Sequence, residues 1–280
     1  MIHFAKAHAC GNDFLIVTSE AAAGRNWADL ARRLCGRNTG VGADGVEFFT
    51  WTKNAAGARA GRIRLHNADG SIAEISGNGT RCVAAWMAAQ LDSNPGDLIE
   101  IETDAGVRVG RIESVCRHAG RICSVEARTG MGVPQLESKS VRLADGAIVH
   151  GMQVSTGNPH FVITAEEASF SVDGRAWQGI GDEICHHADF PNQTNVEFAL
   201  VKGPGEIEIR IFERGVGPTT SSGTGSTASA AAAIAQGLAQ SPLTVTAPGG
   251  AQRVEWKGVG NELFLTGPAV VIAEGEAWCE

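Results

Sequence analysis

The feature that most constrains the fold of this chain is an internal repeat. When the sequence is laid over itself with an offset of about 146 residues, three polar segments come into register: 11–14 with 157–161, Asn67 with Glu213, and 76–79 with 222–225. A fourth echo, 46–48 with 196–198, appears at an offset of about 150. Four echoes in the same order indicate two halves derived from one ancestral unit. The period is too long for a solenoid, whose repeats run roughly 20 to 50 residues.

The expected domain boundaries follow from this repeat. The halves should separate near residues 130 to 150. We expect an N-terminal half over residues 1–140 and a C-terminal half over residues 141–267. A final strand, at about residues 268–280, is expected to rejoin the first half.

Within each half, short apolar runs between Gly and Asp turns predict strands, and helices are fewer. The clearest helices follow the two Ser-Gly-x-Gly segments, over residues 80–91 and 226–238, and a third is expected over residues 27–34. Many strands with a few helices favour an α+β fold, in which each half packs a helix against its own curved sheet.

Composition excludes several classes of protein. The 280 residues carry a net charge of −8 with a pI near 5.5, which disfavours nucleic acid as a partner. No signal-peptide pattern and no apolar run near the ~20 residues of a membrane helix is present, so no membrane partner is expected. Seven cysteines, an odd number without C-x-x-C spacing, argue against a disulfide framework or a zinc site. They favour a reducing, cytoplasmic location.

The two Ser-Gly-x-Gly segments predict a binding site for an anion. Glycines let backbone approach a ligand, and the first N–H groups of a helix, with the helix dipole, attract negative charge. Such donors would come from Gly77 and Asn78 in one half and from Gly223 and Thr224 in the other. If the halves face each other across a cleft, a carboxylate could sit between both helix starts. The side chains of residues 76 and 222 would then flank the carbon that bears it.

Seven segments spread over almost the whole chain resemble the diaminopimelate epimerase family: CGNDF, NADGS, GNGTR, TGNPH, NVEF, ERGVG and SGTG. The resemblance implies an α+β fold of two pseudo-symmetric halves, each a curved, mostly antiparallel sheet around a central helix, with the active site in the cleft between them. It also implies cofactor-independent epimerisation of LL-diaminopimelate to meso-diaminopimelate by two-base proton transfer at the α-carbon, in lysine and cell-wall precursor biosynthesis. A homodimer is suggested by the same resemblance.

Residue roles carry over from this resemblance by position. The groups around the distal end of a small amino-acid substrate would be Asn67, Asn158, Asn195 and Arg214, with Asn12 also lining the pocket. The reacting α-carboxylate would be held by Gly77, Asn78, Gly223 and Thr224. Glu213 and His160 resemble the assisting pair near the α-amino group. The sequence shows no lysine motif for a pyridoxal cofactor and no metal-ligand spacing, so neither a cofactor nor a metal is expected.

The chain departs from the family at both proton-transferring positions. The family has a cysteine immediately before each helix-opening glycine, and here these residues are Ser76 and Ser222. A helix N-terminus can lower a cysteine pKa to roughly 3.5–7.5, but a serine hydroxyl is far more basic and needs an adjacent base. His160 and Glu213 are the evident candidates for that base.

Three explanations of the paired serines stay open. They are an engineered inactivation, a natural lineage in which hydroxyls transfer the proton with help from His160 and Glu213, and a binding protein that kept the pocket and lost the reaction. Gly45 also replaces the glutamine usual in the family. An alternative function is therefore another amino-acid racemase or small-acid isomerase on the same fold.

Overall fold

The structure is a computed structural model that describes residues 1–73 and 76–278, and it divides into two compact units. Unit 1 comprises Met1–Thr129 with Gly267–Glu280, and unit 2 comprises Gly130–Thr266. The final segment groups with the first unit, although its last two residues, including Cys279, lie outside the described part of the chain. The division falls about ten residues before the expected position at 140, because β9 (Gln135–Arg142) pairs along its whole length with β10 (Ile148–Ser155).

The remaining elements follow one order in both units. Unit 1 contains β1 (Ile2–Ala9), β2 (Asn12–Thr18), α1 (Trp27–Cys35), β3 (Gly45–Lys53), β4 (Arg59–Asn67), β5 (Ile72–Ala73), α2 (Gly77–Leu91), β6 (Leu98–Thr103), β7 (Gly106–His118), β8 (Arg121–Gly130) and the later part of β17 (Leu263–Ala277). Unit 2 contains β9, β10, β11 (Pro159–Ala165), α3 (Trp177–Cys185), β12 (Asn195–Gly203), β13 (Glu206–Glu213), β14 (Gly217–Thr219), α4 (Gly223–Ala235), β15 (Leu243–Ala247), β16 (Gly250–Trp256) and the first part of β17.

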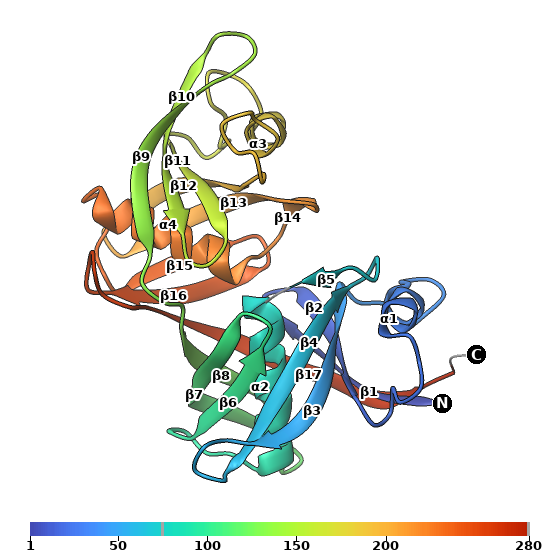
Figure 1. Cartoon of the computed structure of the whole chain (residues 1–280). Coiled ribbons are helices and arrows are strands. Elements are labelled where there is room, and N and C mark those ends of the chain that lie inside the picture. The colour runs from blue at the N-terminus through green and yellow to red at the C-terminus, as the bar shows by residue number, and fades with distance from the viewer. Residues whose placement is uncertain (74–75, 279–280) are drawn as a thin grey trace. The chain divides into compact units, whose positions relative to one another are not determined.

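The sheet of unit 1 closes around α2. Its strands pair in the order β1, β2, β3, β4, β6, β7, β8 and β17, and β17 pairs back to β1. The pairs β2–β3 and β4–β6 are parallel, so α1 and α2 are the crossover helices between them. All eleven residues from Asn78 to Ala88 are buried. A helix that is buried on every side needs strands on every side, and Figure 1 shows α2 running among the strands of this unit.

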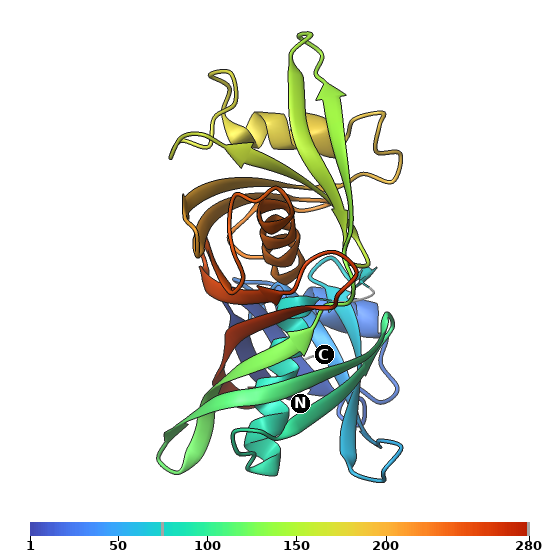
Figure 2. The same cartoon turned by 90° about the vertical axis from the view of Figure 1, so that its left-hand side faces the viewer.

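Unit 2 repeats this plan around α4. The pairs β11–β12 and β13–β15 are parallel, and the pairs β10–β11, β12–β13 and β15–β16 are antiparallel. α4 packs against β10 to β13, β15 and β16 (Figure 2), and its residues from Gly225 to Ala233 are buried. Each unit has its own core around its central helix. The predicted α+β fold with two similar halves is confirmed.

One strand belongs to both units. β17 pairs with β16 through residues such as Leu265 and with β1 through residues such as Val271. The chain thus completes the sheet of unit 2 before it completes the sheet of unit 1. None of the helices in the described part of the chain is long and apolar enough to cross a membrane.

Candidate active site: two serine-capped helix starts

The first predicted proton-transferring residue caps α2. Ser76 has extended backbone (φ −121°, ψ 122°), and its Oγ accepts a hydrogen bond from Gly79 N at 3.0 Å. Its carbonyl oxygen accepts the hydrogen bond from Thr80 N at 2.8 Å that begins the helix. Serine is a favoured N-cap because its oxygen replaces a missing backbone acceptor. Gly77 and Asn78 follow directly, so their N–H groups belong to the first turn of the helix and lie at its positive end.

The start of α4 has the same construction. Ser222 is its N-cap with extended backbone (φ −146°, ψ 127°), and its Oγ accepts a hydrogen bond from Gly225 N at 3.1 Å. Gly223 and Thr224 take the places of Gly77 and Asn78. Each unit therefore contains one serine hydroxyl beside a helix start suited to a carboxylate.

Each helix start also contacts an asparagine at the beginning of a neighbouring strand: Asn12 is the first residue of β2, and Asn158 directly precedes β11. In unit 1, Asn78 Nδ2 donates to Asn12 Oδ1 at 3.2 Å. In unit 2, Asn158 Nδ2 donates to Thr224 Oγ1 at 3.3 Å. The two predicted pocket asparagines thus occupy matching places but have opposite polarity. Asn12 presents an acceptor to its helix start, whereas Asn158 presents a donor.

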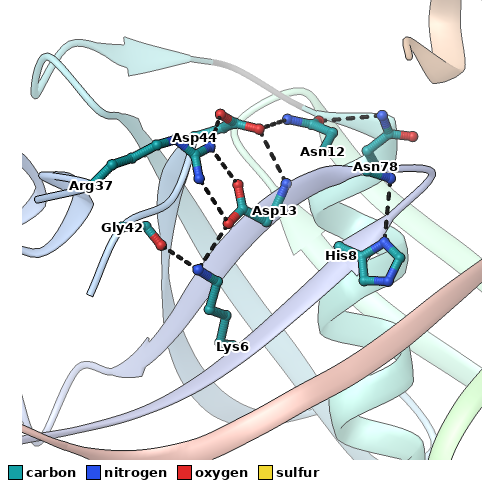
Figure 3. Close-up of polar contacts among 9 residues, drawn as sticks. Lys6, His8, Asn12, Asp13, Arg37, Gly42, Asp44 and Asn78 are labelled. Carbon is teal, nitrogen blue, oxygen red and sulfur yellow. Dashed lines mark hydrogen bonds and ion pairs between the residues drawn. The ribbon is translucent and has the colours of Figure 1, made fainter. Parts of the chain in front are cut away.

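An acidic anchor sets the orientation of Asn12 (Figure 3). Asn12 Nδ2 donates to Asp44 Oδ2 at 2.6 Å, which leaves Oδ1 facing α2. Arg37 links Asp44 to Asp13, with Nη2 2.7 Å from Asp44 Oδ1 and 2.8 Å from Asp13 Oδ1. Lys6 Nζ lies 3.0 Å from Asp13 Oδ2. Burial raises the pKa of Asp13, but hydrogen bonds from Arg37 and Lys6 more than reverse this, so its pKa lies below the usual range and the network stays ionised.

His160 sets the orientation of Asn158. The ring is fully buried, with Nδ1 2.7 Å from Glu197 Oε1 and Nε2 3.0 Å from Asn158 Oδ1. Because an amide oxygen only accepts, Nε2 must carry a proton. One further proton is shared between Nδ1 and the Glu197 carboxyl. Both ring nitrogens are therefore occupied, and His160 reaches the start of α4 through Asn158.

A buried cation lies at the start of α2. Arg81 is 2% exposed, its Nη1 donates to Gly77 O at 3.2 Å, and its Nη2 donates to Asn78 Oδ1. Among residues 1–73 and 76–278, no carboxylate forms an ion pair with it. Its positive charge therefore adds to the helix dipole and strengthens the attraction for an anion.

Two predicted distal-recognition residues of unit 2, Asn195 and Arg214, are joined by a hydrogen bond. Asn195, the first residue of β12, accepts from Arg214 N through Oδ1 at 2.9 Å and donates from Nδ2 to Pro159 O at 3.0 Å. The Arg214 guanidinium is held through Nη1 by Asn192 O at 3.1 Å. Glu213 is the last residue of β13, immediately before Arg214. One asparagine thus ties together the strand ends that carry Pro159 and Arg214.

Asn67, the predicted distal residue of unit 1, forms its side-chain hydrogen bond with a nearby loop residue and not with the capped helix α2. Asn67 ends β4, and its Nδ2 donates to Ser71 Oγ at 3.0 Å. It pairs across the sheet with Gly45. A Cβ at Gly45 would lie 2.9 Å from His66 O, so the local backbone leaves little room for the side chain usual at this position in the resembled family.

Two buried glutamates beneath the helix starts are not among the residues predicted from sequence. A Cβ at Gly79 would lie 2.1 Å from Glu47 Oε1, and a Cβ at Gly225 would lie 2.8 Å from Glu197 Oε1. Both glutamates are fully buried. The sequence did contain a signal for them, since the echo of 46–48 with 196–198 pairs Glu47 with Glu197.

The cysteines nearest to α2 do not replace the missing thiols. Cys82 is fully buried within α2, and burial raises its pKa well above the usual range, so it holds its proton. Cys10 is buried in the turn after β1. Among the described residues, no group of three or more His, Cys, Asp or Glu side chains could hold a metal ion.

Solved structures define the class of fold to which this arrangement belongs. A phenazine biosynthesis protein of the PhzF family from Bacillus anthracis superposes with a TM-score of 0.74 at 16% identity, covering 100% of this chain and 99% of that one. A probable proline racemase from Agrobacterium radiobacter superposes with a TM-score of 0.70 at 16% identity, covering 100% and 94%. At this identity the likeness shows a shared fold only.

Sequence comparison gives the family within that fold class. The family model described as "Diaminopimelate epimerase" matches residues 4–131 and 152–272. The diaminopimelate epimerase of Moorella thermoacetica is 35% identical over 290 residues, covering 98% of this chain and 99% of that protein. That of Desulfitobacterium hafniense is 35% identical over 288 residues, covering 96% of each. The chain belongs to the diaminopimelate epimerase family.

Proposed function

We propose that this chain is an isomerase that converts LL-diaminopimelate to meso-diaminopimelate by proton transfer at one α-carbon. The observation that supports this most is the occurrence of the same serine-capped helix start in both units of a chain that belongs to the epimerase family. A carboxylate bound by both helix starts would place its α-carbon between two hydroxyls. The reaction would need no organic cofactor and no metal.

The proposed roles divide the site residues into four groups. Ser76 and Ser222 exchange protons with the α-carbon, while the first N–H groups of α2 and α4, from Gly77, Asn78, Gly223 and Thr224, hold the α-carboxylate. The distal amino and carboxylate groups are bound by Asn12, Asn67, Asn158, Asn195 and Arg214. Glu213 and His160 assist near the α-amino group. Because His160 is buried, it acts through its hydrogen bond to Asn158.

The chemistry follows from where charge develops. Removal of the α-proton puts negative charge on the carbon and on its carboxylate, and pre-oriented N–H groups stabilise that charge in the transition state. The buried charge of Arg81 adds to this effect at α2. The family assignment further supports a homodimer, and the odd cysteine count supports the cytoplasm, as parts of the same proposal.

The test is isotope exchange. Purified protein incubated with LL-diaminopimelate in D₂O should incorporate deuterium at the α-carbon and produce the meso isomer, both measurable by NMR and chiral chromatography. Ser76→Ala and Ser222→Ala should each abolish net epimerisation. Ser138→Ala, which removes an exposed serine of β9, should leave the rate unchanged. Tight binding of the substrate without any deuterium incorporation would refute the proposal.

Ligand binding without turnover is a second candidate. It is favoured by one observation, the presence of serine at both positions where the family has a thiol. Thermal-shift screening with diaminopimelate isomers, histidine, proline and unsaturated dicarboxylates would identify the ligand, including that of another amino-acid racemase or small-acid isomerase. A gain of strong epimerase activity in Ser76→Cys/Ser222→Cys would show that the pocket fits diaminopimelate.

A further inference from the structure

The two buried glutamates occupy equivalent places in the two units. Glu47 lies on β3 opposite Leu65 and beside Ile16 of the parallel strand. Glu197 lies on β12 opposite Ile211 and beside Val162. All four neighbours are apolar and belong to the cores around α2 and α4. A carboxyl group in such a core is costly unless it has a specific partner or function.

Each glutamate lies at the capped end of the central helix. The space above Gly79 is bounded by Glu47 Oε1 at 2.1 Å and by Ser76 Cβ at 3.2 Å from an added Cβ. The space above Gly225 is bounded by Glu197 Oε1 at 2.8 Å and by Ser222 Oγ at 3.2 Å. Because each glycine lacks a side chain, a carboxyl group and the serine that caps the same helix border one small space above that glycine.

The two units differ in what the glutamate contacts. Glu197 has His160 as a partner, at 2.7 Å. In unit 1 the place of His160 is taken by Phe14, because Phe14 pairs with Gly45 as His160 pairs with Asn195. Within the described part of the chain, neither oxygen of Glu47 has a hydrogen-bond partner. Unit 1 thus contains a lone carboxyl group where unit 2 contains a carboxyl–imidazole pair.

Its surroundings favour the protonated form of Glu47. Burial raises its pKa to about 8, so the group holds a proton at neutral pH. Cys82 of α2 lies in the same core, and the titratable or charged groups that act on it are Arg81 on α2, Glu47 on β3, Asp13 on β2 and Cys10 after β1. Arg81 lowers and the other groups raise the Cys82 pKa.

The Ser76 hydroxyl accepts a hydrogen bond but does not donate one within the described part of the chain. Its Oγ is the acceptor for Gly79 N, and no group among the described residues accepts its hydroxyl hydrogen. A serine hydroxyl exchanges protons with carbon only when an adjacent group restores or removes its own proton, since its alkoxide is too basic to persist at neutral pH. Glu47 is the buried acid that borders the same space above Gly79 as the Ser76 side chain.

We propose that Glu47 supplies and recovers the proton that Ser76 exchanges with the substrate α-carbon, acting through the serine rather than on the substrate. This inference rests on the proposed epimerase function. In one direction the Ser76 O–H bond breaks as the new Cα–H bond forms, and the Glu47 O–H bond breaks to restore the serine hydroxyl, leaving a carboxylate. In the other direction the Cα–H proton passes to the serine oxygen and the serine proton passes to the Glu47 carboxylate. No electrons are gained or lost.

The paired serines are then compatible with catalysis because each has a buried proton-holding group. Ser76 has the lone acid Glu47, and Ser222 has the Glu197–His160 pair, which holds one shared proton. The two units are thereby chemically unequal, as a reaction with one donor and one acceptor requires. Glu47 is a positioning and proton-relay residue, and its test must separate that role from a purely structural one.

The experiment compares Glu47→Gln with wild type in the full chain. Loss of a general acid–base contribution should lower kcat by about 10² to 10⁴-fold with little change in KM. Since the equilibrium constant between the two isomers does not depend on pH, both isomers should show the same loss of kcat/KM above about pH 8, where Glu47 loses its proton, and this limb should vanish in Glu47→Gln. Glu126→Gln, which changes an exposed glutamate of β8, should behave as wild type.

A second variant keeps the test independent of folding. A thiol at position 76 can hold or release its own proton, so Glu47→Gln should cost less than about tenfold in a Ser76→Cys background. A merely structural glutamate would cost the same in both backgrounds. Unchanged kcat and pH profile in Glu47→Gln, with active wild type, would overturn this inference and leave the epimerase function intact. Absence of isotope exchange in wild type would overturn both.

Discussion

At the scale of single residues, the two units use one set of positions for opposite chemistry. Asn12 and Asn158 match in place, yet Asp44 directs the oxygen of Asn12 to α2 while His160 directs the nitrogen of Asn158 to α4. The orientation of a side-chain amide is fixed only by a neighbour that can act solely as a donor or solely as an acceptor. The carboxylate of Asp44 and the protonated Nε2 of His160 provide that, so matching positions of the duplicated scaffold have opposite hydrogen-bonding polarity.

Glu47 should also affect how the free energy of unfolding depends on pH. The pKa of this group is about 8 when folded and near the ordinary 4.5 when unfolded. Between these values the folded chain binds one more proton than the unfolded chain, so the free energy of unfolding falls as pH rises, by about 1.4 kcal/mol per pH unit from this group. Glu47→Gln should abolish that slope.

Urea unfolding at pH 5.5, 6.5 and 7.5 measures this effect as the difference in unfolding free energy between wild type and Glu47→Gln. The difference should shift in favour of the variant as pH rises, and it should level off above about pH 8. Glu126→Gln serves as the control and should show no such trend. A difference that stays constant across the three pH values would mean that Glu47 is ionised in the folded chain.

At the scale of elements, the sequence predicts the capped helices α2 and α4, but of the other helix pair it predicts α1 and not α3. Ser-Gly-x-Gly before a run of small residues is a local pattern, so the starts of α2 and α4 follow from a few consecutive residues. α3 was missed because Gly179 and Gly181 lower its helix propensity and Ala176 offers no side-chain cap. β7 has a weak sequence signal because most of its residues are exposed and its apolar alternation is weak.

The candidate site divides in the same way. The two serines, the helix-start residues that follow them and the asparagines lie in short motifs, so the sequence predicts them. The buried glutamates lie in strands, where a single Glu between apolar residues reads as a solvent-facing position. Only the packing of β3 and β12 against the central helices shows that Glu47 and Glu197 are enclosed.

The two glycines of α3 should respond to alanine with opposite signs. A Cβ at the exposed Gly179 would meet no atom within 4 Å, so Gly179→Ala should stabilise unit 2 by about 0.5–1 kcal/mol through helix propensity. A Cβ at Gly181 would lie 2.7 Å from Phe212 Cβ, so Gly181→Ala should destabilise it by about 1–3 kcal/mol. Thermal or urea unfolding of both variants measures the contrast, and stabilisation by both would show that α3 can move away from β13.

At the scale of the whole molecule, the most consequential feature is that the sheet of unit 1 is completed by the last strand of the chain. The later residues of β17 pair with β1, and β17 also pairs with β8, so this segment closes the ring around α2. Ala269 is fully buried in the core of unit 1. Folding of unit 1, and with it the Ser76 helix start, therefore depends on residues that follow all of unit 2.

Removal of residues 267–280 should unfold the two units unequally. Unit 2 keeps β16 and its β17 partners up to Thr266, whereas unit 1 loses the strand between β1 and β8. Hydrogen exchange read by mass spectrometry should become at least about tenfold faster in peptides of β1, β2 and α2, while peptides of β12, β13 and α4 keep most of their protection. Val259→Ser, at an exposed turn residue before β17, should change neither set. Equal loss of protection in both units would show that they fold as one cooperative body, in which the order of strands along the chain does not decide which helix start forms.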